Sequence, residues 1–108
     1  MTDPQIEKIK SAVATAHHIP PDKKSELLNL LGRLEPAISK ASETQREDAA
    51  RVSKLLEQSA HAASGENLEH LETTLGELKE TMRRFEASHP ELVSFVTEYS
   101  ALLSALGF

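Results

Sequence analysis

The chain lacks cysteine and tryptophan altogether, and only four glycines and four aromatic residues occur among its 108 residues. Without cysteine there is no disulfide framework, no thiolate zinc site and no cysteine nucleophile. So few glycines leave little material for an active-site loop, and the sequence has no nucleophile elbow, phosphate-binding glycine motif or zinc signature. We therefore expect a protein that is not an enzyme and that holds neither a cofactor nor a metal.

Long apolar runs are missing as well. No uninterrupted apolar stretch approaches the roughly 18–20 residues of a membrane span, and the start MTDPQIEKIK lacks the basic-then-apolar order of a signal peptide. These features predict a soluble cytoplasmic protein of bacterial type that does not bind membranes. Hydrophobic residues make up 39% of the chain, too many for a disordered protein, and its length suits one domain with a modest core.

Basic side chains are too few and too scattered to form a nucleic-acid surface. The formal charge is −5, and residues 66–108 alone carry eight acidic and three basic residues. Binding to phosphates requires clustered Lys and Arg. The adjacent basic pairs are Lys23 with Lys24 and Arg83 with Arg84, and both have acidic neighbours. We interpret them as solvated helix surface and expect no nucleic-acid partner.

Apolar residues recur throughout at helical rather than strand spacing, with intervals of three and four residues. The sequence therefore predicts an all-α fold, an antiparallel bundle of four to five helices with a coiled-coil-like seam, in one domain of residues 1–108. Within it we expect an N-terminal helical hairpin at 1–40, a spacer helix at 42–64, a seam helix at 66–87 and a C-terminal helix at 90–106.

Prolines divide the N-terminal hairpin. Thr2 or Asp3 is expected to cap its first helix, which must end before Pro20. The second helix is expected to begin near Pro21, because a missing amide donor costs nothing in the first turn. Pro36 either ends or kinks this helix or opens a further turn, and the sequence leaves these cases open.

The spacer helix has a thin apolar face made mostly of alanine, so we expect it to pack peripherally or at close approach. Ser42 or Thr44 has the spacing of a capping box at its start. Gly65 is expected to end it, with Asn67 capping the next helix. A single long helix running through Gly65 is the alternative.

The strongest pattern follows this break. We call its apolar positions the seam residues, and they are Leu68, Leu71, Leu75, Leu78, Met82, Phe85, Leu92, Val96, Tyr99, Leu103 and Leu106. Burial of each of the first six contributes about 1.5–3 kcal/mol before ordering entropy, so this segment is expected to organise the fold. The flanking positions lack the charge ladder of a parallel zipper. Packing within the chain or against an antiparallel partner is favoured.

A short motif, FEASHP, stands at residues 85–90, between the seam helix and the last helix. Together with the amphipathic helix that follows, it resembles a small bacterial family catalogued as a domain of unknown function, number 4404. The resemblance covers residues 68–108 well and 5–35 loosely, whereas the spacer at 42–65 is longer than expected. It implies a corner formed by Phe85, Glu86, His89 and Pro90. The family has no established activity, so it implies no catalytic residue.

His89 is the most suggestive single side chain, because it lies at a seam position and precedes Pro90 at a helix start. Ser88 and Glu91 have capping-box spacing around it. In one interpretation its ring packs over the corner and caps local backbone groups. In the other it is a protonation switch, since a helix N-terminus disfavours imidazolium. That hypothesis fails if His89→Asn leaves the pH dependence of thermal unfolding unchanged.

Other polar pairs are interpreted as helix surface rather than as metal or acid–base sites. Two ligands do not make a metal site, and acid–base carboxylates need an apolar pocket or an oriented partner. The pairs are His17 with His18, Glu66 with His70, and Glu86 with Glu91.

The function expected from this pattern is a non-enzymatic structural or protein-interaction module. We expect it to self-associate as a homodimer or to bind a helical partner protein, because the apolar stripe at 68–106 is long beside so thin a spacer helix. The alternative is a bundle that holds a small apolar ligand or a metal. It predicts a cavity near Phe85, Phe95 and Tyr99, with the Tyr99 hydroxyl as its polar group.

Overall fold

The computed structural model describes residues 4–16, 19–65 and 67–105, and every regular element in these ranges is helical. The prediction of an all-α bundle is therefore confirmed. The five α-helices are α1 (Pro4–Thr15), α2 (Pro21–Thr44), α3 (Arg46–Ser64), α4 (Leu68–Met82) and α5 (Pro90–Ser104), and a short 3-10 helix, η1 (Arg83–Phe85), follows α4.

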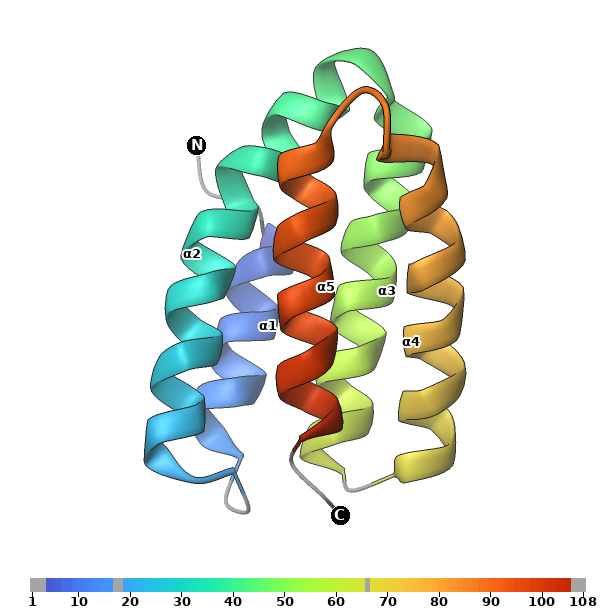
Figure 1. Cartoon of the computed structure of the whole chain (residues 1–108). Helices are drawn as coiled ribbons and strands as arrows, with labels where there is room; N and C mark the ends of the chain where they lie inside the picture. The colour runs from blue at the N-terminus through green and yellow to red at the C-terminus, as the bar shows by residue number, and fades with distance from the viewer. Residues whose placement is uncertain (1–3, 17–18, 66, 106–108) are drawn as a thin grey trace.

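The helices alternate in direction along the chain, so that consecutive helices are antiparallel (Figure 1). Helix α3 packs against α1, α2 and α4, and α2 packs against α1, α3 and α5. Helix α5 lies in front of α3 and beside α2 in Figure 1, and it meets α4 mainly near their shared corner. The chain thus forms an up-and-down bundle with α3 surrounded by its neighbours.

Of the two expectations for the spacer helix, the central place of α3 agrees with close approach and not with peripheral packing. Its thin apolar face is the reason, because short side chains allow neighbouring helices on several sides of one helix. The buried residues of α3 are Ala49, Val52, Ser53, Leu55, Leu56, Ser59, Ala60, Ala62 and Ala63.

Helix α2 runs through Pro36 to Thr44, so of the cases that the sequence left open, the one in which Pro36 ends this helix is excluded. A proline inside a helix costs about 3 kcal/mol or more, yet the buried stripe continues on both sides of it through Leu34 and Ile38. The N-terminal hairpin therefore extends past residue 40, and α3 begins at Arg46 rather than at 42. Neither predicted cap is used, because the preceding residue Gln45 takes the cap position, where its side chain makes no capping hydrogen bond.

The predicted break at Gly65 is confirmed, since α3 ends at Ser64 and α4 begins at Leu68. The Asn67 side-chain oxygen accepts a hydrogen bond from the His70 amide at 3.1 Å, as expected of an N-cap. Gly65 has φ of −88°, so it ends the helix without the left-handed conformation typical of such glycines. The expected caps Thr2 and Asp3 lie outside the described residues.

Most seam residues are buried inside the chain itself, which agrees with the favoured intrachain packing. The buried ones are Leu71, Leu78, Met82, Phe85, Leu92, Val96, Tyr99 and Leu103. Leu75 is half-buried, and Leu106 lies outside the described residues. Leu68 is 46% exposed, so its prediction as a core residue is wrong. None of the described helices is both long and apolar enough to cross a membrane.

Candidate functional site

Two helix junctions meet at one end of the bundle, at the top of Figure 1. The junction of α2 with α3 contributes Thr44 and Gln45, and the corner between η1 and α5 contributes Ser88 and His89. The Thr44 hydroxyl lies 2.9 Å from Nε2 of His89. The Gln45 side chain donates to the Arg84 carbonyl at 3.0 Å and accepts from the Ser88 hydroxyl at 2.5 Å. Two side chains at the junction of α2 and α3, Thr44 and Gln45, therefore hold the corner between η1 and α5 by hydrogen bonds, although they lie some forty positions earlier in the sequence.

The ring of His89 packs over the corner as one interpretation expected, with its centroid 6.1 Å from that of Phe85 and the rings tilted by 56°. The other half of that interpretation is wrong, because His89 is the cap residue of α5 but makes no side-chain capping bond. The predicted capping box is also wrong, since the Ser88 hydroxyl is bonded to Gln45. The protonation-switch hypothesis for His89 stays a prediction.

A groove runs between the second half of α2 and the start of α5. It consists of two hollows of about 360 and 310 Å³, and both are lined by Ala37, Lys40 and Glu91. We call it the α2–α5 groove, and its walls are Arg33, Pro36, Ala37 and Lys40 from α2 with residues 88–92 and Phe95 from the corner and α5.

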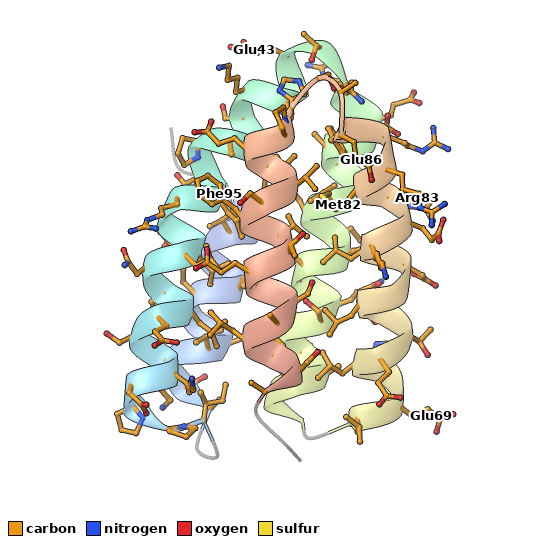
Figure 2. The ribbon with its side chains drawn as sticks, viewed as in Figure 1. Glu43, Glu69, Met82, Arg83, Glu86 and Phe95 are labelled. Atoms are coloured by element: carbon orange, nitrogen blue, oxygen red, sulfur yellow. The ribbon has the colours of Figure 1, made fainter. Side chains whose placement is uncertain are left out.

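The α2–α5 groove combines an apolar floor with two cations. Arg33 and Lys40 are exposed, and neither forms an ion pair with any described residue. They are seven residues apart on α2, about 10.5 Å along its axis. Between them lie Pro36 and Ala37, and Phe95 points from α5 toward α2 (Figure 2).

The aromatic residues expected to surround a ligand cavity lie apart. Tyr99 and Phe85 are fully buried, whereas Phe95 is half-buried and lines the α2–α5 groove. The Tyr99 hydroxyl lies 3.0 Å from the Ser59 hydroxyl and donates to the Leu56 carbonyl at 3.3 Å. Burial raises the pKa of the Tyr99 phenol, and the smaller effect of the hydrogen bond with Ser59 lowers it. This hydroxyl is therefore already used within the core.

The basic pairs singled out in the sequence make contacts typical of helix surface. Lys23 and Glu26 form an ion pair at 3.7 Å, and Lys24 donates to the Ala14 carbonyl at 3.2 Å. Both arginines of the second basic pair form ion pairs, Arg83 with Glu80 and Arg84 with Asp48, each at 3.8 Å.

The acidic and histidine pairs bring no metal site together. Glu86 and Glu91 are both exposed, and Glu91 lines the α2–α5 groove. Within residues 4–16, 19–65 and 67–105, no three His, Asp or Glu side chains are placed to hold a metal ion. His17, His18 and Glu66 lie outside these ranges.

The chain matches no family model, no curated protein and no solved structure. The resemblance of its corner to the domain-of-unknown-function family therefore stays a prediction.

Proposed function

We propose that this protein is a non-enzymatic interaction module that self-associates, and that the α2–α5 groove is the surface through which it does so. The observation that carries the proposal is the groove's composition. Arg33 and Lys40, which form no ion pair with a described residue, lie on either side of the apolar residues Pro36, Ala37 and Phe95. Protein interfaces combine such elements, because apolar burial supplies affinity while charged groups at the rim select and orient the partner.

The buried seam residues, Leu71 to Leu103, are not the proposed association surface. The long apolar stripe of α4 and α5 favours a partner helix, but most of its residues are buried within one chain, where α4 packs against α3 and α5 against α2. Self-association would therefore use another surface. The α2–α5 groove is suited to it because it combines apolar contact area with the cations of Arg33 and Lys40.

An enclosed small-molecule site is less well supported. Such sites bury about 70–90% of a ligand's surface. Most walls of the α2–α5 groove are exposed side chains, among them Arg33, Pro36 and Lys40, so the groove is open along its length. It suits a side chain presented by another protein surface. Native mass spectrometry of freshly purified protein tests the alternative, which an unexplained mass increment would favour.

Light scattering over a range of protein concentrations tests the proposed function. We expect the wild-type mass to rise above that of one chain, and the variant Arg33→Glu/Lys40→Glu to stay monomeric. The matched control is Lys8→Glu/Arg51→Glu, which makes the same change in net charge at exposed positions of α1 and α3. The control should associate as the wild type does. A monomeric wild type, or an unaffected groove variant, would refute the proposed function.

A further inference from the structure

Leu68 is the only large hydrophobic side chain that is exposed in the described part of the chain. It is the first residue of α4, at the end of the bundle opposite the corner. Glu69 and Glu72 are exposed in the same turn, and Figure 2 shows Glu69 projecting outward there. This end of α4 therefore presents one apolar side chain beside two carboxylates, and we call it the Leu68 knob.

We propose that the Leu68 knob of one copy docks in the α2–α5 groove of a second copy. This inference rests on the proposed function and names the surface that the groove receives. Leu68 would enter the hollow of about 310 Å³ between Arg33 and Phe95, which has room for a leucine side chain. Its burial removes exposed apolar area from water on both partners.

The charges of the two surfaces are complementary. The α2–α5 groove carries Arg33 and Lys40 against the single carboxylate of Glu91. The Leu68 knob carries Glu69 and Glu72, one and four residues from Leu68, so they stay within about 6 Å of it along the axis of α4. Seating Leu68 on the groove floor therefore brings carboxylates toward unpaired cations. These pairs are weakened by added salt.

Groove-to-groove pairing of two copies is disfavoured by the same charges. Each α2–α5 groove has two cations and one carboxylate, so a symmetric contact would face surfaces of like sign. The Leu68 knob is a different surface, and the resulting contact is head-to-tail.

The positions of the α2–α5 groove and the Leu68 knob determine which kind of assembly this contact forms. The second half of α2 and the start of α5, which line the α2–α5 groove, lie at the upper end of the bundle in Figure 1, whereas α4 begins, with Leu68, at the lower end. The bundle measures 37 Å along its longest dimension, so one chain cannot dock its own knob in its own groove. A docked pair of copies leaves one groove and one knob free, so further chains add end to end or the chains close into a ring.

Mixing two variants tests this inference. The first is the groove variant Arg33→Glu/Lys40→Glu, and the second is Leu68→Ser, a change at an exposed position. Each alone should weaken self-association about tenfold or more, because each removes one half of the contact. An equimolar mixture should form a dimer that does not grow further, since the first retains an intact knob and the second an intact groove. Circular-dichroism melts check that both variants fold.

The outcomes separate this inference from the proposed function. If the groove variant is monomeric but Leu68→Ser associates as the wild type does, the groove is used and the docking of Leu68 is wrong. If both variants are monomeric and their mixture stays monomeric while the wild type associates, the two surfaces do not meet. If the wild type never associates, both proposals fail. Dimer formation in the mixture, weakened by salt, supports the head-to-tail contact.

Discussion

The hydroxyl of Tyr99 lies 3.0 Å from the hydroxyl of Ser59, and both side chains are fully buried. The Ser59 hydroxyl donates to the Leu56 carbonyl at 2.7 Å, and the Tyr99 hydroxyl donates toward the same carbonyl at 3.3 Å. A single polar cluster thus fixes α5 on the central helix α3. Every polar atom in it has a partner, as a buried polar group requires.

Tyr99→Phe should lower the free energy of unfolding by about 1 kcal/mol, the typical net contribution of one hydrogen bond. The loss should be this small because Ser59 still donates to the Leu56 carbonyl, so no buried group is left without a partner. Urea denaturation measures it. Tyr99→Ala, which also removes the ring, should cost about 3–5 kcal/mol. Equal losses for the two variants would contradict this account.

The buried phenol of Tyr99 also makes stability depend on alkaline pH. Burial raises its pKa in the folded chain, so above the ordinary tyrosine value near 10 the unfolded chain releases this proton while the folded chain retains it. The stabilising contribution is complete below that pH and falls as the pH rises beyond it. Wild type should therefore lose stability relative to Tyr99→Phe as the pH increases above about 10. Parallel stability profiles for the two proteins would exclude the effect.

Because the chain has one tyrosine and no tryptophan, phenolate absorbance reports Tyr99 alone. In an alkaline titration the phenolate signal should appear together with the loss of helical circular dichroism. A phenolate signal that precedes unfolding would show that the Tyr99 hydroxyl is accessible to solvent.

The helices could be predicted because their period depends on local spacing, which the sequence displays directly. The seam residues from Leu71 to Leu103 illustrate this, since nearly all of them are buried. The place of α3 could not be read in the same way. Small residues such as Ala49 and Ser59 fit a peripheral or a central helix equally well until their neighbours are known. Pro36 was ambiguous for a similar reason, because the packing that overrides its cost is tertiary.

Gln45→Ala should lower the free energy of unfolding by about 1 kcal/mol, because the Gln45 side chain bonds both Arg84 and Ser88 across the corner. The matched control is Gln58→Ala on α3, whose side chain makes no hydrogen bond within the described part of the chain. Chemical denaturation of both variants gives the comparison. Equal losses would show that the bonds of Gln45 do not stabilise the corner.

Gly76→Ala should raise the free energy of unfolding by about 0.5–1 kcal/mol. Gly76 lies in the interior of α4 and is exposed, and a Cβ there would meet nothing within 4 Å. Alanine is the better helix former because it loses less conformational entropy on folding. Gly65→Ala should raise the free energy of unfolding by less than Gly76→Ala does, because the added Cβ would lie 3.3 Å from the His61 carbonyl oxygen. If Gly76→Ala proved less stable than the wild type, Gly76 would have to meet a neighbour that is not present in the structure of the single chain.

The candidate site was not predictable from sequence, because its parts come from helices distant in the chain. In the sequence, Arg33 and Lys40 resemble ordinary surface cations, because nothing there places α5 beside them. Phe95 lines the α2–α5 groove and not the expected cavity with Phe85 and Tyr99. The partners of His89 were hidden for the same reason, since Thr44 is 45 residues away. One available signal was the spacing of Arg33 and Lys40, which puts them on one face of a helix with Pro36 and Ala37 between.

Backbone amide chemical shifts, followed as the protein concentration is raised, test most directly whether the α2–α5 groove receives a second copy. We expect concentration-dependent shifts at Arg33 to Lys40 and at Leu68 to Glu72, and none on the outer face of α1 around Lys8. Shifts confined to other surfaces, or spectra that do not change with concentration, would contradict this account.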